Sequence, residues 1–152
     1  MRFLRFFGYG IDGRSRRGDE GQALAEMAIV LPILMLLVFG IIEMSNAWRT
    51  FQVVTNSARE GARTAILPGT DEPAIMDRVR RTLEGGGLVF DQANITVECI
   101  GTDGNPTGSA VCSTSGQEAR IGIGYPFTFR VLGVLADLVP ITITSTTAMR
   151  NE

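Results

Sequence analysis

Three residues near the start of the chain have types and spacing that could do chemistry. Gly21 and Gln22 form a peptide bond, and Glu26 follows five residues after the glycine, just before the uncharged apolar run 27–42. A residue without a side chain suits a protease that must bind an extended backbone closely. An ionisable group at the edge of a membrane span is expected to have a function. The spacing therefore predicts a processing site followed by a functional carboxylate.

Elsewhere the sequence offers few groups for catalysis. The 14 cationic residues are all arginine, and histidine is absent, so the commonest general base and the commonest zinc ligand are missing. The net charge of -2 is too small to indicate a nucleic-acid-binding surface, which must neutralise several phosphates. We therefore predict a protein that is not an enzyme, with no catalytic residue, no cofactor, no metal and no nucleic acid partner.

The helix that carries Glu26 is long enough to cross a membrane. Residues 23–42 form a largely apolar stretch of about 20 residues, the length that spans a bilayer core. Glu43 is the first ionisable residue after it. The positive-inside rule therefore predicts a cytoplasmic N-terminus and export of the chain after about residue 43. Five arginines precede the stretch: Arg2, Arg5, Arg14, Arg16 and Arg17.

The helical pattern continues beyond this stretch and predicts one helix over residues 22–67, transmembrane in its first half and ended by Pro68 and Gly69. Pro32 removes a backbone donor and is a candidate kink. Apolar residues recur at steps of three or four: Met44, Ala47, Trp48, Phe51, Val54, Ala58, Ala62 and Ala65. Polar residues fall largely on the other side: Glu43, Asn46, Arg49, Gln52, Asn56, Arg59, Glu60 and Arg63.

Two other processing schemes fit parts of this pattern. Residues 45–47, Ser-Asn-Ala, have the form of a signal peptidase site, which would release a secreted soluble binding domain after Ala47. Alternatively, the chain stays unprocessed as a single-pass anchored protein. A signal peptide needs no amphipathic extension in phase with its apolar region, so the continuing helix disfavours release at Ala47.

The charged segment Arg59, Glu60, Gly61, Ala62 and Arg63 also invites attention. On a helix Glu60 and Arg63 are close enough to pair, and the small residues permit close packing. We predict that this segment docks the helix onto the rest of the protein. A contact surface for a partner subunit is the alternative.

Residues 68–152 are predicted to form an exported globular head. Pro73 opens a helix that runs to about Glu84, and three glycines end it. Residues 131–139 are apolar and fit a short helix, a loop over the core or a subunit contact. Alternating residues predict an antiparallel sheet of three or four strands, with strands at 94–100, 120–130 and 141–149.

Cys99 and Cys112 are the only cysteines, and both lie in the part predicted to be exported, where oxidation is permitted. We therefore expect a disulfide between them. Closing a loop of about 14 residues would contribute roughly 3 kcal/mol.

Three segments, 21–32, 39–43 and 58–63, resemble the TadE-like family, the minor pilins or pseudopilins of the bacterial tight adherence (Tad, Flp pilus) apparatus. Residues 125–127 and 141–150 resemble the C-terminal parts of such proteins more weakly. The resemblance implies an α+β, type IV pilin-like fold, in which a long N-terminal transmembrane helix packs on the small head. Flp-type major pilins are shorter and often have tyrosine where this chain has Met27, which places this chain among the accessory subunits.

The resemblance also implies a processing step and a set of partners. A prepilin peptidase would cut between Gly21 and Gln22 and remove residues 1–21 as a cytoplasmic leader. Other pilin and pseudopilin subunits, the inner-membrane assembly machinery and the lipid bilayer would be the remaining partners. The chain would reside in the bacterial inner membrane, with its head periplasmic or extracellular, and would help build an adhesive pilus.

Physical chemistry gives Glu26 a role in such an assembly. Cleavage would create an α-amine on Gln22 that is positively charged at neutral pH. Glu26 of an incoming chain could neutralise the amine of its neighbour and so set the axial register between the two helices. In the alternative, Glu26 merely extends to the cytoplasmic interface.

Overall fold

The structure is a computed structural model that describes residues 16–129 and 141–152, with side chains from residue 21 onward. Residues 1–15 of the predicted leader and the apolar piece 131–139 lie outside the described residues. The described part of the chain divides after Phe39 into two compact units. The element order is α1 (Arg16–Ala65), α2 (Glu72–Gly85), the 3-10 helix η1 (Phe90–Gln92), β1 (Asn94–Ile100), β2 (Glu118–Phe127) and β3 (Ile141–Arg150).

The first unit contains the N-terminal part of α1. Its helix begins at Arg16, so it starts before residue 22, where the processing site led us to place the boundary. Within the described residues, one helix is long and apolar enough to cross a membrane, and only 6% of its most apolar window is buried. A helix with so much exposed apolar surface is compatible with a single-pass membrane anchor and unlike the core helix of a soluble protein.

The second unit begins at Gly40 and includes the C-terminal part of α1. This part ends at Ala65, and Gly69 makes the turn that follows with a φ of 77°, a left-handed conformation that glycine adopts without steric cost. A stripe of small or short side chains faces the rest of the unit. Its members are Thr50, Val54, Ser57, Ala58, Ala62 and Ala65.

The apolar face predicted for this part of α1 is only partly correct. Its C-terminal residues are buried, but Met44, Trp48 and Phe51 are 70%, 60% and 39% exposed. Glu43, which the pattern placed on the polar side, is only 2% exposed. The helix therefore buries a face rotated away from the one that its largest apolar residues define.

Helix α2 forms where local signals predict it. The Asp71 side chain caps it by accepting a hydrogen bond of 3.0 Å from the Ala74 backbone amide, and Pro73 lies in its first turn. Both features favour helix initiation. Gly87, with a φ of 81°, follows the end of α2. The buried residues of α2 are Ile75, Val79 and Leu83.

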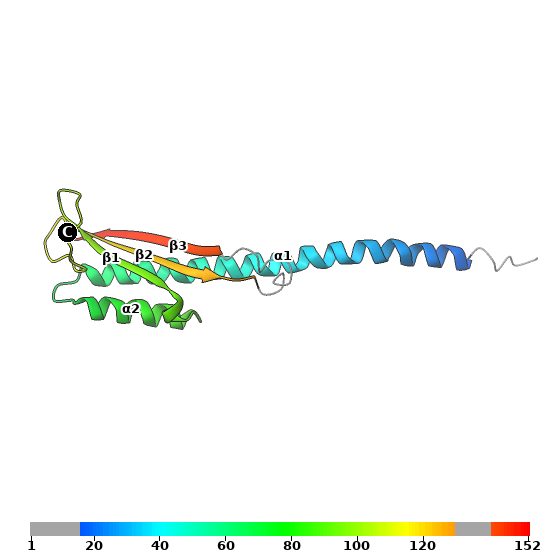
Figure 1. Cartoon of the computed structure of the whole chain (residues 1–152), viewed down its shortest axis with the longest axis horizontal. Coiled ribbons are helices and arrows are strands. Elements are labelled where there is room, and N and C mark those ends of the chain that lie inside the picture. The colour runs from blue at the N-terminus through cyan, green and yellow to red at the C-terminus, as the bar shows by residue number, and fades with distance from the viewer. Residues whose placement is uncertain (1–15, 130–140) are drawn as a thin grey trace, which may run out of the picture. The chain divides into compact units, whose positions relative to one another are not determined.

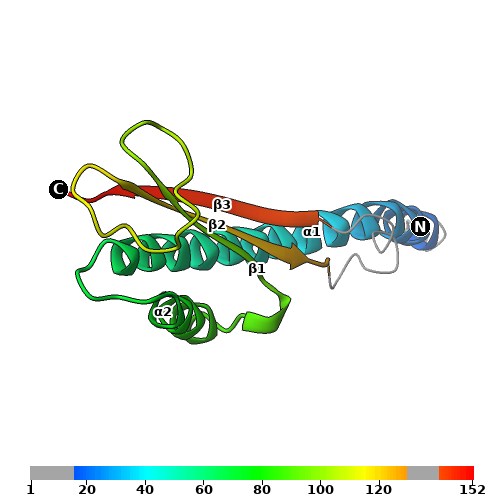
Figure 2. The ribbon, with the colours of Figure 1, turned by 60° about the vertical axis from the view of Figure 1, so that its left-hand side comes forward.

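The three strands form one antiparallel sheet in the order β1-β2-β3, with Cys99 opposite Ala119 and Ala119 opposite Met149. In Figures 1 and 2 the strands run beside the cyan-green C-terminal part of α1, and α2 lies along the same helix. Alternate residues of β2 enter the core: Ala119, Ile121, Ile123 and Tyr125. The predicted α+β class with one further helix and a three-stranded sheet is confirmed.

Candidate functional site

The predicted processing site lies on the exposed N-terminal part of α1. The Gln22 side-chain amide donates a hydrogen bond of 3.1 Å to Glu26 Oε1, one helical turn away. A side chain added at Gly21 would meet nothing within 4 Å. If the chain were cut after Gly21, the new α-amine would lie at the helix N-terminus, one turn before Glu26. A carboxylate is favoured there because the helix dipole is positive at that end.

The bond between Gly21 and Gln22 is part of the helical backbone, because α1 begins at Arg16. A protease that binds an extended substrate must therefore unwind the first turns of α1. Glycine within a helix costs about 1 kcal/mol relative to alanine, so Gly21 lowers the free energy of that unwinding. The same residue thus leaves space at the bond and weakens the helix around it.

The segment around Gly61 lies where α1 meets the core of the second unit. Gly61 has no room for a side chain, because an added Cβ would be 2.7 Å from Val79 Cγ2 and 2.8 Å from Ile121 Cδ1. Glu60 forms an ion pair of 2.9 Å with Arg78 of α2, not the pair with Arg63 that the sequence allowed. Arg59 and Arg63 are exposed. Gly61 and Glu60 thus contact the rest of the unit, whereas the two arginines face solvent.

We expect Gly61→Val to destabilise the second unit by about 2–3 kcal/mol, since overpacking a tight core typically costs 1–3 kcal/mol. Gly85→Ala is the matched control, because a Cβ at Gly85 meets nothing within 4 Å. That change should be neutral or slightly stabilising, since alanine favours a helix over glycine. Urea unfolding of the full chain in detergent, followed by circular dichroism, measures both. Equal stability of the two variants would contradict close packing at Gly61.

Comparison with known proteins identifies this N-terminal segment. Residues 21–63 match the family model of TadE-like proteins. The match begins at the glycine of the predicted processing site and ends at Arg63, and it confirms the resemblance seen in the sequence. No curated protein and no solved structure matches the chain.

The predicted disulfide between Cys99 and Cys112 is present, and it joins β1 to the loop that follows it. The Cys112 amide donates to the carbonyl of Ala65, the last residue of α1, at 3.2 Å. The Asn151 side-chain amide donates to the Cys112 carbonyl at 3.0 Å. The disulfide loop therefore ties together β1, the end of α1 and the C-terminus.

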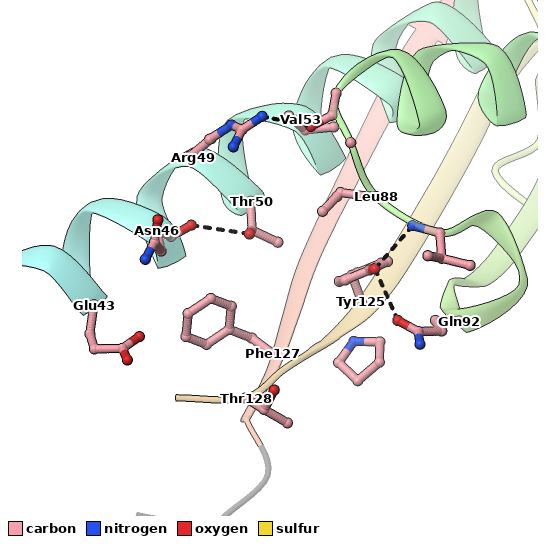
Figure 3. A pocket seen from close by; sticks show the side chains of 14 residues that line it. Glu43, Asn46, Arg49, Thr50, Val53, Leu88, Gln92, Tyr125, Phe127 and Thr128 are labelled. Carbon is pink, nitrogen blue, oxygen red and sulfur yellow. Dashed lines mark hydrogen bonds between the residues drawn. The ribbon is translucent and has the colours of Figure 1, made fainter. Parts of the chain in front are cut away.

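A cleft of about 400 Å³ lies where α1, the α2–β1 connection and the end of β2 come together (Figure 3). Glu43 and Thr50 line it from α1. The Tyr125 hydroxyl donates to Gln92 Oε1 at 3.0 Å and accepts from the Val89 amide at 3.1 Å. Sequence reasoning missed this cleft. The one available signal was that Glu43 and Thr50 lie seven residues apart, in phase with the residues of α1 that are buried further along.

Among the described side chains, no group of three or more histidine, cysteine, aspartate or glutamate residues could hold a metal ion. In the loop between the cysteines, the side chain and backbone of Asn105 donate hydrogen bonds to Asp103 and lower the pKa of that carboxyl. Such bonds are those of a polar turn.

Proposed function

We propose that this chain is a minor pilin or pseudopilin that is cleaved by a prepilin peptidase after Gly21 and helps to assemble a bacterial Tad pilus for surface attachment. Its role is structural, not enzymatic. One observation carries the proposal: the most apolar window of a helix long enough to span a membrane is almost entirely exposed, and the same helix bears Glu26 one turn after Gln22. The match to TadE-like proteins covers the same segment.

In this proposal the apolar part of α1 anchors the chain in the inner membrane, with the leader in the cytoplasm and the head outside. Cleavage removes the leader and creates the α-amine of Gln22. Glu26 of an incoming chain then pairs with the amine of a neighbouring pilin or pseudopilin subunit. Because a wrong axial offset would leave both charges unpaired in an apolar surrounding, the pair selects one register between the helices.

The N-terminus of the protein recovered from cell membranes, pili and the culture medium tests the proposal. We expect mass spectrometry to find Gln22 as the first residue, since the proposed cut follows Gly21. A mature chain that begins at Trp48 would instead show release by signal peptidase. An intact Met1 would show an unprocessed single-pass protein. Either of these results would overturn the proposed processing.

A further inference from the structure

One face of α1 stays apolar and exposed where the helix enters the second unit. Ile41, Met44 and Trp48 are 59%, 70% and 60% exposed, and Phe51 is 39% exposed. They follow one another at steps of three or four residues and therefore lie along one side of the helix. The rings of Trp48 and Phe51 are neighbours, with centroids 5.7 Å apart. We call these four residues the outer strip.

Two charged side chains that neighbour the outer strip in the sequence contact other parts of the second unit. Glu43, the first ionisable residue after the apolar run, is 2% exposed and lines the cleft. The Arg49 guanidinium donates to the Gly86 carbonyl at 3.2 Å. The Ser45 hydroxyl is satisfied within the helix by donating to a backbone carbonyl one turn before it, at 2.9 Å. On this face of α1, the outer strip thus extends the apolar surface past Ile42 with no charged residue between them among those that the structure describes.

The position of Trp48 along the helix matches the boundary of a bilayer. Trp48 lies six residues after Ile42, the last residue of the apolar run, which is about 9 Å at 1.5 Å per residue. The 16 residues of the run measure about 24 Å, so a hydrocarbon core of about 30 Å that is centred on the run extends roughly 3 Å beyond Ile42. Trp48 then lies about 6 Å outside the core, within a headgroup layer of roughly 5–8 Å. Tryptophan is enriched at this level, where its apolar ring contacts the acyl chains and its N–H finds polar partners.

We propose that the outer strip binds the lipid headgroup region of the outer leaflet, with Trp48 as the interfacial anchor. The ring lies against the acyl boundary and the indole N–H donates to lipid oxygens. Met44 lies one turn nearer to the core, and Phe51 lies one turn further out. This contact would set the depth of α1 before the subunit leaves the membrane. The inference rests on the membrane-anchored state of the proposed function, but not on cleavage or on incorporation into the pilus.

Trp48 is the only tryptophan in the chain, so its fluorescence reports on the outer strip directly. The full chain is reconstituted in phosphatidylcholine–phosphatidylglycerol vesicles whose acyl chains are brominated either near the headgroup or near the chain end. We expect blue-shifted emission and at least about twofold stronger quenching by the shallow bromine, as for an interfacial ring. Emission as in water, with no quenching by either lipid, would overturn the proposal.

A double variant that combines Trp48→Phe with Phe51→Trp moves the only indole about 4.5 Å outward along the helix. Quenching of its tryptophan emission by the shallow bromine should be clearly weaker than in the wild-type chain. Equal quenching in the two chains would show that the position of the indole along the helix does not set its contact with lipid, and this result would overturn the proposal. Blue-shifted emission that is not quenched and grows with the protein-to-lipid ratio would assign the strip to a second copy of the chain, which also overturns the proposal.

Flotation of the same vesicles separates the two levels of inference. A chain that floats with the vesicles while Trp48 is not quenched would leave the proposed membrane anchor standing and refute the lipid contact of the outer strip. A chain that does not float would refute both.

Discussion

Replacing Glu26 with glutamine is expected to leave cleavage after Gly21 intact but to reduce incorporation of the processed chain into pili by more than about 100-fold. Glutamine has nearly the same shape as glutamate but no charge. A buried charge that loses its partner costs about 3–5 kcal/mol, and each 1.4 kcal/mol is a factor of ten. Immunoblots of membrane and sheared pilus fractions measure incorporation, and the mature N-terminus measures cleavage.

Gln22→Ala is the matched control for this variant. It removes the side-chain amide that donates to Glu26 but keeps the α-amine that cleavage would create. Incorporation should therefore remain close to that of the wild-type chain. Full incorporation of Glu26→Gln would refute the register contact. Failure of Gln22→Ala would shift the role to the side-chain amide.

The sequence predicts the bounds of helices and strands to within a few residues where local signals specify them. The cap and proline at the start of α2, and the glycines after it, act within one turn of the residues they affect. β1 was predicted at the bounds observed, Asn94–Ile100, and β2 and β3 within three residues. The disulfide followed because two cysteines in an exported segment leave one intramolecular pairing.

The buried face of α1 was not predictable in the same way. Helical periodicity shows that residues share a face, but it does not show which face meets the rest of the chain. Glu43 is buried and Trp48 exposed because the head packs against a stripe of smaller residues, a choice made by contacts with residues distant in sequence. The partner of Glu60 is Arg78, 18 residues further along, and no local rule identifies it.

The start of α1 shows a different limit. The predicted boundary at residue 22 came from the expected cleavage site, which describes a mature chain. The uncleaved backbone instead continues as a helix to Arg16, since nothing in this segment forbids helix apart from the modest cost of Gly18 and Gly21. The structure thus adds a step to the proposed processing: the helix must open before the bond can be cut.

This step makes Gly21 the position where a single substitution should act most strongly on processing. We expect Gly21→Leu to slow cleavage by at least about 100-fold, because a misfitting side chain in a protease pocket alone can cost that much. Leucine also stabilises the helix by up to about 1 kcal/mol relative to glycine, which opposes opening. Pulse-chase labelling should therefore show full-length precursor accumulating in the membrane, with Met1 still at its N-terminus.

Gly40→Leu provides the matched control, since it makes the same substitution in the same helix, at a glycine where an added Cβ also meets nothing within 4 Å. Its cleavage rate should equal that of the wild-type chain, because Gly40 lies about 19 residues, or roughly 28 Å of helix, from the cut. A block in both variants would point to failed membrane insertion. Wild-type cleavage of Gly21→Leu would show that the peptidase does not recognise this glycine, and the proposed site would have to be abandoned.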